Sequence, residues 1–318
     1  MTQDCKISIN TQLPLKVPYR TGSYLVYDYI PPKDKNEDPS APAATHFRMG
    51  TKIGLRASGS RQVDVDSYAK ILKTVAAEVP RAGKFFVVDL RQESHLFFDG
   101  RAVSWYADKD WSNVDQSLDW ILHDESCRID MSRGKTVQIF TTRKNESDDT
   151  IIPIDYCNVA VKYAQPEEEV INYIESGLDR RIVYERLPVS DHCRPTMDAA
   201  NAFIALIWNL KPQETWIHFH CHGGDGRTTS FLAMYDMFCA AKSATTNFPN
   251  IEKFAERQME LFDYNLNPYI PLPGCDEKKS WKCGLAKQRW KFLIEWHKWL
   301  ADGALKTGKP FEFKEAAP

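Results

Sequence analysis

One stretch, residues 216–230, constrains this chain more than any other. It reads Trp-Ile-His-Phe-His-Cys-His-Gly-Gly-Asp-Gly-Arg-Thr-Thr-Ser. An apolar run enters a glycine-rich segment, and an amphipathic segment follows, so the pattern predicts a strand, a tight loop and a helix. The loop contains Cys221 and, six residues later, Arg227. We interpret this stretch as the place where the chemistry of the chain is located.

The residue types in this loop suit the binding and cleavage of a phosphate ester. Three glycines between Cys221 and Arg227 allow the backbone N–H groups to turn inward around an anion. The loop ends where a helix is predicted to begin, and the free N–H groups and dipole of that helix favour anions and a cysteine thiolate. Arg227 can bind two phosphate oxygens at once, and Thr228 can donate a hydrogen bond to the cysteine sulfur. We therefore predict Cys221 as nucleophile and Arg227 as phosphate clamp, with the phosphate site lined by His222, Gly223, Gly224, Asp225, Gly226 and Thr228.

The Cys-x5-Arg spacing by itself proves little, because the chain contains it three times. The pair Cys127 and Arg133 encloses no glycine, and the pair Cys283 and Arg289 lies in a segment with helical periodicity. Only the loop at 221–227 combines a preceding strand, several glycines and a helix start. The alternative interpretation of that loop is a glycine-rich turn around a buried cysteine.

The segment 220–229 resembles the active-site loop of the protein-tyrosine-phosphatase superfamily. Its doubled threonine after the arginine is similar to the branch known as cysteine phytases, or PTP-like inositol polyphosphate phosphatases. The resemblance covers roughly residues 45–300 and is weakest between about 115 and 180. The other stretches that carry it are Leu-Pro-Val-Ser-Asp-His-Cys-Arg-Pro-Thr at 187–196, Val-Asp-Leu-Arg-Gln-Glu-Ser-His at 88–95 with Ala-Val-Ser-Trp-Tyr at 102–106, and Gly-Leu-Arg-Ala-Ser-Gly-Ser at 54–60.

The resemblance implies an α/β fold: a protein-tyrosine-phosphatase-like core with a mainly parallel sheet flanked by helices, plus a small β-rich, partial-barrel insertion. We expect residues 45–114 and 181–303 to form the core and residues 115–180 the insertion. A strand at 24–30 is a candidate addition to the insertion, and residues 304–318 are expected to be a loose tail. Periodicity predicts helices at 63–79, 166–177, 197–210, 228–241, 251–262 and 281–300, and strands at 84–90, 136–142, 151–161 and 182–187.

Asp191 is the candidate general acid. It lies thirty residues before Cys221, at the end of a predicted strand. An aspartate before a helix is most often an N-cap or turn residue. Its place in the family-like stretch 187–196 implies instead the acid that protonates the leaving oxygen, which is typically worth about 10²–10⁴-fold in rate. The neighbouring His192 matches the family too. We expect it to contact substrate or to orient Asp191, and the alternative is a buried structural histidine.

Three further groups are singled out near these motifs. In the family, an arginine near the position of Arg48 reaches the substrate phosphates, which implies that role for Arg48; the alternative is a solvated surface arginine. A lysine-bearing segment lines the family's pocket, which implies Lys282, whereas the alternative is a solvated charge run. The polar cluster 91–95 follows a strand end, where ligand groups gather in parallel sheets. It is expected to brace the catalytic loop or to form an internal polar network.

The resemblance implies hydrolysis of phosphate monoesters, phytate and other inositol polyphosphates above all, through a cysteinyl-phosphate. We expect no metal and no cofactor, because Arg227 and the loop amides supply the positive field. Asp225 is a departure, because it places a carboxylate where a polyanion has to bind. Two alternatives therefore stay open: a protein phosphotyrosine or dual-specificity phosphatase, and a catalytically silent phosphoinositide-binding module.

Composition limits the partners and the location. The 318 residues carry a net charge of −2, so no global field attracts nucleic acid or membrane, and the expected partner is a small polyphosphorylated molecule bound by a monomer. A hydrophobic content of 43% suffices for a large core, and the eight cysteines show no zinc-ligand spacing. No apolar run reaches transmembrane length, and residues 1–19 lack a signal-peptide h-region. The compartment stays open, including export by a leaderless route or with a leader removed.

Overall fold

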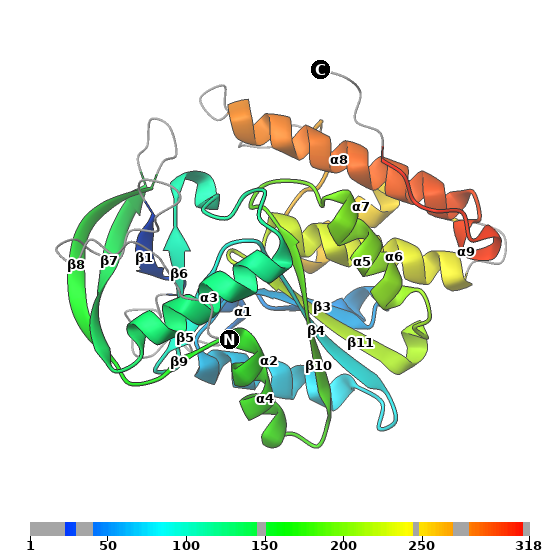
Figure 1. The fold of residues 1–318 in the computed structure, drawn as a ribbon. Coiled ribbons are helices and arrows are strands. Elements are labelled where there is room, and N and C mark those ends of the chain that lie inside the picture. Colours follow the sequence, from blue (N-terminus) through cyan, green and yellow to red (C-terminus); the bar gives the residue numbers. More distant parts are fainter. Residues whose placement is uncertain (1–22, 30–40, 145–150, 244–247, 270–279, 314–318) are drawn as a thin grey trace.

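A computed structural model of the chain describes residues 23–29, 41–144, 151–243, 248–269 and 280–313. Residue 30 of the predicted strand 24–30 and residues 314–318 of the predicted tail lie outside this range. Within it, the strands form two sheets (Figure 1). Helices cover both faces of one of these sheets, and the predicted catalytic loop follows the carboxyl end of the central strand of that sheet.

The sheet that carries the catalytic loop has the strand order β10-β4-β11-β3-β2. Its first four strands run parallel to their neighbours and only β2 is antiparallel, which confirms the predicted mainly parallel sheet. The strands are β2 (Arg48–Met49), β3 (Ala57–Arg61), β4 (Lys84–Arg91), β10 (Ile182–Val189) and β11 (Thr215–Cys221).

Both faces of this sheet are buried, which explains the continuous apolar runs of its strands. Along β4, Phe86 and Val88 face one hydrophobic cluster while Phe85 and Val87 face the other. The first cluster is covered by α5 (Met197–Ile207), α6 (Gly226–Ser243), α7 (Ile251–Leu261) and α8 (Ser280–Ala301). The second is covered by α2 (Val65–Glu78) and α4 (Glu167–Ser176), so the sheet lies between two helical layers (Figure 1).

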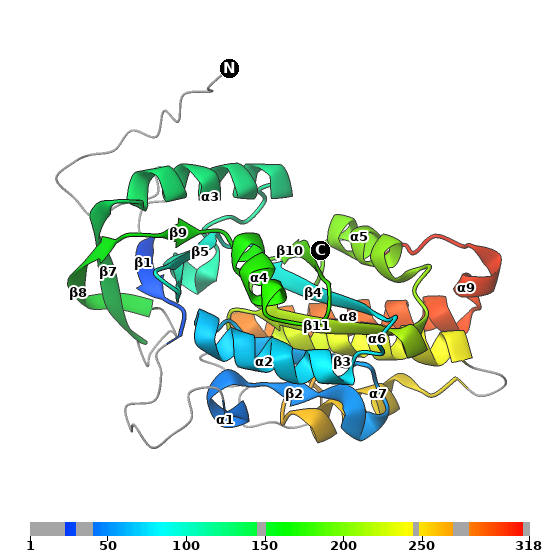
Figure 2. The ribbon, with the colours of Figure 1, turned by 90° about the horizontal axis from the view of Figure 1, so that it is seen from below.

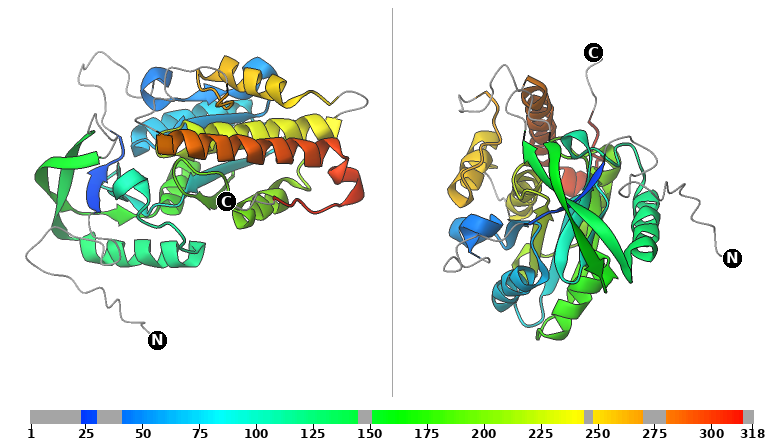
Figure 3. Two further views of the ribbon diagram at one scale, coloured as in Figure 1. Left: turned by 90° about the horizontal axis from the view of Figure 1, so that it is seen from above. Right: turned by 90° about the vertical axis from the view of Figure 1, so that its left-hand side faces the viewer.

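Helices α6 and α8 run side by side across the sheet (Figure 3). The indole N–H of Trp296 in α8 donates a hydrogen bond to the carbonyl of Met234 in α6 at 3.1 Å. The aromatic residues of α8 from Trp290 to Trp299 are therefore core packing. The N-terminus of α6 lies at the catalytic loop, so α8 supports the helix on which that loop rests.

The second sheet is mixed, with the order β8-β7-β1-β6-β5-β9. It takes β5 and β6 from residues 95–106, ahead of the segment 115–180, and β1 from near the N-terminus. A β-rich unit beside the core is thereby confirmed, while the division of the chain into domains stays a prediction. The strands are β1 (Tyr24–Tyr27), β5 (His95–Phe98), β6 (Arg101–Tyr106), β7 (Lys135–Lys144), β8 (Ile151–Val161) and β9 (Ala164–Gln165).

Helix α3 (Leu118–Ser132) lies along the second sheet (Figure 2) and was not predicted. Its buried side is largely charged, because Asp124, Glu125 and Arg128 all lie inside the protein. Ser94 donates to Asp124 at 2.6 Å, and the backbone N–H of His95 donates to Glu125 at 2.9 Å. Hydrophobic periodicity cannot detect a helix that buries a polar face.

The expectation of a loose tail after residue 303 is wrong for the described part of that segment. Residues 304–307 form α9 (Ala304–Thr307), in which Ala304 is fully buried. Phe311 is 4% exposed, with its ring 5.2 Å from that of Trp296 and 5.3 Å from that of Phe292. The segment closes the aromatic core along α8. The remaining short elements are α1 (Pro42–Thr45), η1 (Gly50–Ile53), η2 (Asp108–Asp110) and η3 (Pro212–Glu214).

No helix among the described residues combines the length and the apolar composition that a bilayer crossing requires.

Candidate active site

The predicted catalytic loop connects the carboxyl end of β11 with the first turn of α6. Cys221 is a free thiol and is only 2% exposed. Its Sγ atom accepts hydrogen bonds from the backbone N–H of Gly224 and from the hydroxyl of Thr228, each at 3.2 Å. The sulfur therefore lies at the floor of the loop beside the N-terminus of α6, whose free N–H groups and dipole favour an anion.

The curl of the loop depends on glycine at position 224, where φ is +77°. A Cβ atom at Gly224 would lie 2.6 Å from the backbone nitrogen of Arg61, so a side chain there would push the loop away from β3. A Cβ atom at Gly59 would likewise lie 2.6 Å from Cγ2 of Thr228. The loop thus packs directly against the backbone of β3. This contact accounts for Gly59 in the family-like stretch 54–60.

Arg227 is 2% exposed and is held on three sides. Its two terminal nitrogens donate to the two carboxylate oxygens of Glu93 at 2.7 and 3.0 Å, and Nη1 also donates to the carbonyl of Val189 at 3.0 Å. Nη2 lies 3.0 Å from Oδ1 of Asp191. Although burial alone would lower the pKa of Arg227, Glu93 and Asp191 raise it well above its ordinary value. The guanidinium is therefore charged and fixed before any ligand arrives.

Glu93 belongs to the polar cluster 91–95, and its contacts confirm that this cluster braces the catalytic loop. Glu93 is fully buried, and it also accepts a hydrogen bond from Nε of Arg91 at 2.9 Å. Arg91 in turn contacts Asp28, which follows β1, at 2.7 Å. Burial would raise the pKa of Glu93, but Arg227 and Arg91 outweigh burial and lower it. Charges of alternating sign thus run from the second sheet to the catalytic arginine.

The predicted acid, Asp191, lies opposite the catalytic loop. One carboxylate oxygen contacts Arg227, and the other is 3.1 Å from Nε2 of His192. Burial raises the pKa of Asp191, but Arg227 and His192 outweigh burial and lower it below its ordinary value. Burial also lowers the pKa of His192, whose backbone has a left-handed φ of +63°. The structure thus places Asp191, His192 and Arg227 together, as the sequence predicts.

Two tryptophans and two lysines form one rim of the site. The ring of Trp281 lies 5.2 Å from that of His192 and 6.0 Å from that of Trp111, both edge to face. Lys282, which was predicted to bind substrate, has its Nζ atom 5.2 Å from the centre of the Trp281 ring. Nζ of Lys109 lies 5.1 Å from the centre of the same ring. Lys282 is therefore close to the loop that carries Asp191. Lys109 adds a second cation that the sequence did not indicate.

The loop itself also carries Asp225, which is about half exposed and pairs with His46 at 3.0 Å. Nδ1 of His46 is also 2.8 Å from the carbonyl oxygen of Gly223. His46 lies just after α1, far from the loop in sequence, and tethers the loop at this side. The carboxylate of Asp225 thus shares Nδ1 of His46 with the carbonyl oxygen of Gly223.

The expectation that Arg48 reaches the substrate needs correction. Arg48 is 5% exposed, and its Nη1 donates to the carbonyl of Gly224 at 2.6 Å and to that of His46 at 3.0 Å. Its Nη2 donates to the hydroxyl of Thr229 at 3.0 Å. These bonds hold the guanidinium behind the loop, where it supports the backbone that forms the anion site. The alternative of a solvated surface arginine is equally wrong.

His222 points from the loop to a buried acid that the sequence did not indicate. Nδ1 of His222 lies 2.8 Å from Oδ2 of Asp110, at the end of η2. Burial and the nearby Glu93 raise the pKa of Asp110 to about 6. Burial opposes protonation of His222, but Asp110 and Asp28 outweigh burial and raise its pKa. The two side chains form a hydrogen-bonded pair close to the catalytic loop.

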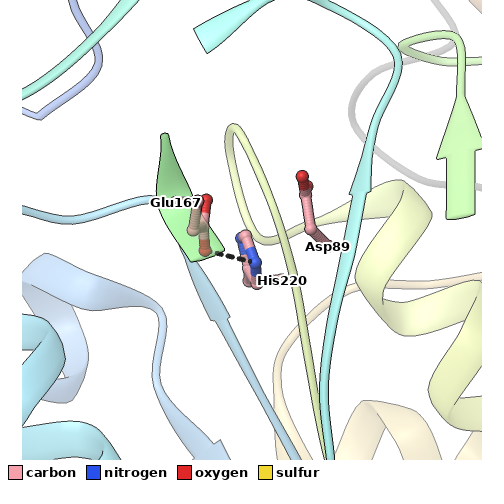
Figure 4. Close-up of side chains that lie close together, drawn as sticks. All are labelled: Asp89, Glu167 and His220. Carbon is pink, nitrogen blue, oxygen red and sulfur yellow. Dashed lines mark ion pairs between the residues drawn. The ribbon is translucent and has the colours of Figure 1, made fainter. Parts of the chain in front are cut away.

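A second buried network includes Asp89, Glu167 and His220, which lie close together (Figure 4). Glu167, the first residue of α4, lies 2.9 Å from Nε2 of His220 and 3.0 Å from Nε2 of His95. The first of these contacts is close but poorly aligned for a hydrogen bond. Asp89 lies 3.3 Å from the same nitrogen of His95 and accepts a hydrogen bond from the hydroxyl of Tyr184 at 3.0 Å. This network connects β11, immediately before the nucleophile, with α4 and with the second sheet.

Two clusters of the described residues bring three candidate metal ligands within 4.8 Å of one another. In both clusters the donors already bind protein groups at distances typical of hydrogen bonds and ion pairs. The clusters are Glu93, Asp110 and His222, and Asp89, Glu167 and His220.

A cavity of about 790 Å³ lies away from this chemistry. Its lining includes Leu55, just before β3, Leu210, just before η3 and β11, and Cys239, near the C-terminal end of α6. Because β3 and β11 begin at this edge of the sheet and run towards the catalytic loop, the cavity lies at the opposite edge. It is not part of the candidate active site.

A family model and two solved structures indicate the same family. A PTP-like phytase family model, described as inositol hexakisphosphate, matches residues 88–239. The structure is similar to that of a PTP-like phytase from Bdellovibrio bacteriovorus, with 28% identity, a TM-score of 0.65, and coverage of 91% of this chain and 92% of that chain. It is also similar to the PTP-like myo-inositol phosphatase from Mitsuokella multacida in complex with myo-inositol-(1,3,4,5)-tetrakisphosphate. There the identity is 25%, the TM-score 0.73, and the coverage 91% of this chain and 48% of that chain.

Among curated proteins, the chain is similar to the effector protein hopD2 of Pseudomonas syringae pv. tomato. The identity is 24% over 285 residues, which cover 86% of this chain and 55% of that protein. The chain thus spans about half the length of this relative and of the Mitsuokella protein.

Proposed function

We propose that this chain, which matches a PTP-like phytase family model over residues 88–239, hydrolyses phosphate monoesters of inositol polyphosphates, phytate included, through a cysteinyl-phosphate. One observation carries the proposal: the sulfur of Cys221 lies at the floor of the loop and accepts hydrogen bonds from Gly224 and Thr228. A structural cysteine needs neither donor, whereas a thiolate nucleophile is stabilised by both.

In the first step the thiolate of Cys221 attacks phosphorus, in line with the ester oxygen. An S–P bond forms and the P–O ester bond breaks, while Arg227 and the loop amides bind the non-bridging oxygens. The leaving oxygen takes its proton from the carboxyl group of Asp191. An inositol alkoxide is a poor leaving group, so this proton transfer is the part of the step that needs positioned help.

The protonation state of Asp191 is expected to change when substrate binds. Its pKa is lowered chiefly by Arg227 against the effect of burial, so in the free protein the group is an ionised carboxylate. A bound phosphate dianion engages Arg227 and places negative charge beside Asp191, and both changes raise the pKa of the carboxyl group. Substrate binding therefore creates the protonated acid that the first step uses.

In the second step water attacks phosphorus and the S–P bond breaks. Asp191, now a carboxylate, accepts the proton of the attacking water, and inorganic phosphate is released. The hydroxyl of Thr228, 3.2 Å from the sulfur, stabilises the departing thiolate. All of the groups named come from one chain, so neither step needs a residue from a second copy.

The inositol polyphosphate assignment is supported by the positions of two cationic side chains near the loop. Lys109 and Lys282 lie on one rim, beside Trp281, and are placed to bind phosphates next to the one being cleaved. The structure of the Mitsuokella protein, in complex with an inositol tetrakisphosphate, supports the same substrate class. One feature favours a second candidate, an aryl phosphate such as phosphotyrosine: the edge-to-face rings of Trp111 and Trp281 offer an aromatic wall.

The test compares substrates and traps the intermediate. We expect turnover of inositol hexakisphosphate to exceed that of a phosphotyrosine peptide in kcat/KM, and we expect rapid acid quench to trap phosphate on Cys221. In Cys221→Ser, turnover should be lost while the ligand still shifts the melting temperature. Preference for the phosphopeptide would favour the second candidate. Retained turnover in Cys221→Ser would refute the nucleophile, and no turnover of any monoester by the wild type would favour a binding module.

A further inference from the structure

The loop that carries Asp191 is held by side chains from distant parts of the chain. The carbonyl oxygen of Asp191 accepts a hydrogen bond from the indole N–H of Trp111 at 2.9 Å. The carbonyl oxygen of His192 accepts one from Nη1 of Arg289 at 3.0 Å. His192 has a left-handed φ of +63°, an uncommon conformation for a residue with a side chain. External hydrogen bonds of this kind stabilise a backbone conformation that the loop would not hold alone.

Arg289 lies between this loop and the catalytic loop. It belongs to α8 and is 5% exposed. Its Nη2 donates a hydrogen bond to the hydroxyl of Tyr264 at 2.7 Å, which fixes the orientation of the guanidinium. A Cβ atom built on Gly226 would lie 3.0 Å from both Nη1 of Arg289 and the hydroxyl of Tyr264. The guanidinium therefore packs against the first residue of α6 while it binds the acid loop.

This arrangement fixes the distance between two parts of the site. Gly226 precedes Arg227, the phosphate clamp, and His192 follows Asp191, the acid. One planar group touches both neighbours, and its planar fork binds the His192 carbonyl and the Tyr264 hydroxyl at the same time. Because a misplacement of about 1 Å in a catalytic group costs up to about 100-fold in rate, such a brace has a kinetic consequence.

We propose that Arg289 is a positioning residue that holds the Asp191 loop against the catalytic loop, and that Tyr264 orients its guanidinium for this purpose. The inference rests on the proposed role of Asp191 as general acid. It concerns a residue that acts through another group, so its removal should weaken proton donation and leave the attack by Cys221 largely intact.

The test uses the leaving group as its readout. A good leaving group such as 4-nitrophenolate needs little protonation, whereas an inositol alkoxide needs it fully. In Arg289→Met we expect kcat to fall about 10- to 100-fold with inositol hexakisphosphate and less than about 3-fold with 4-nitrophenyl phosphate. Arg289→Lys keeps the charge but not the planar fork, so it should show the same selective loss. Tyr264→Phe should show a smaller loss with the same selectivity.

Two comparisons separate positioning from a general structural role. The double variant Asp191→Asn/Arg289→Met should be no slower than Asp191→Asn, because the brace has no function without the acid. Arg257→Met is the matched control: Arg257 binds Asp236 at 2.8 Å in a part of the fold away from the loops, and its loss should not depend on the leaving group.

Several results would overturn the inference. Equal losses on both substrates, additive losses in the double variant, or a change in KM with kcat unchanged would each assign Arg289 to folding or to substrate binding. If Arg289→Met does not fold, Tyr264→Phe and Arg289→Lys decide by the same criterion. If Asp191→Asn itself shows no dependence on the leaving group, the proposed acid is wrong and this inference falls with it. If the loss in kcat depends on the leaving group in Asp191→Asn but not in the Arg289 variants, this inference is wrong and the proposed function stands.

Discussion

Replacing Glu93 with glutamine tests how the catalytic arginine is held. The carboxylate of Glu93 is fully buried and accepts hydrogen bonds from two arginines: both terminal nitrogens of Arg227, at 2.7 and 3.0 Å, and Nε of Arg91, at 2.9 Å. Glu93→Gln keeps the shape of the side chain. It removes the negative charge and turns one acceptor into a donor that faces a guanidinium.

The expected magnitude follows from the burial of the partners. Removing one member of a buried ion pair typically costs about 3–5 kcal/mol, because the remaining charge is left uncompensated. Asp28 still neutralises Arg91 at 2.7 Å, so the charge left uncompensated is mainly that of Arg227, which keeps only the partly exposed Asp191. We therefore expect a loss of about 3 kcal/mol in the free energy of unfolding. Because Arg227 is no longer fixed, kcat should fall by about 100-fold or more.

The pH dependence gives this prediction a sign. The pKa of Glu93 in the folded protein is lowered, chiefly by Arg227 against the effect of burial. A carboxyl group with a lowered pKa in the folded state stabilises the fold above its unfolded pKa of about 4.3, and that contribution is lost as the pH falls below this value. The difference in stability between wild type and Glu93→Gln should thus be full at pH 7 and shrink below about pH 4.

Urea unfolding at pH 7 and at several acidic pH values measures the difference, and steady-state turnover of inositol hexakisphosphate measures the kinetic effect. Glu185→Gln is a matched control, since Glu185 lies exposed on β10 and should change stability by less than about 0.5 kcal/mol. Equal stability of Glu93→Gln and wild type at pH 7, or a difference that stays constant down to pH 3, would show that Glu93 is not the counter-charge described above.

Two further predictions concern the rim and the C-terminal segment. Asp225→Asn removes the half-exposed carboxylate from the loop, so KM for inositol hexakisphosphate should fall about 2- to 5-fold at low salt, with little effect at 0.5 M salt; an unchanged KM at low salt would contradict a repulsive role. Phe311→Ala should lower the free energy of unfolding in urea by about 3 kcal/mol without changing KM, since Phe311 packs against Trp296 and Phe292. A variant as stable as wild type would show that the segment after residue 303 is not part of the core.

The catalytic loop was predictable because its chemistry is consecutive in the sequence. The proposed nucleophile Cys221, the glycines that turn the backbone, the proposed phosphate clamp Arg227 and the helix start all fall within ten residues. The parallel sheet was predictable for a similar reason, because strands such as β4 bury both faces and read as unbroken apolar runs. Where one local rule decides a structure, the sequence is enough.

The groups that support the loop were not predictable in this way. His46, Asp110 and Arg289 come from distant elements, and each is an ordinary polar residue in its own stretch of sequence. Only the folded arrangement shows that they meet at the loop. Arg48 illustrates the same limit from the other side, because the sequence indicated a cation near the site but not that it binds the loop carbonyls from behind.

Helix α3 and the C-terminal segment were missed because hydrophobic patterning describes only apolar burial. The buried side of α3 presents Asp124, Glu125 and Arg128 to the protein, which is the reverse of the usual pattern. Phe311 lies in a short stretch without helical or strand periodicity, and its ring packs against those of Trp296 and Trp299. Each case needed a partner surface that no single segment specifies.

The position of Asp28 has a consequence for attempts to dissect this protein. Asp28 follows the first strand of the second sheet and neutralises Arg91, which shares Glu93 with the phosphate clamp. In a core excised without that strand, Arg91 and Arg227 would both still pair with Glu93. Arg91 would have lost Asp28, so an incompletely neutralised cation would lie next to Arg227. The second sheet therefore cannot be removed without removing a buried counter-charge. A transplanted core would need a new carboxylate beside Arg91 to keep Arg227 in place.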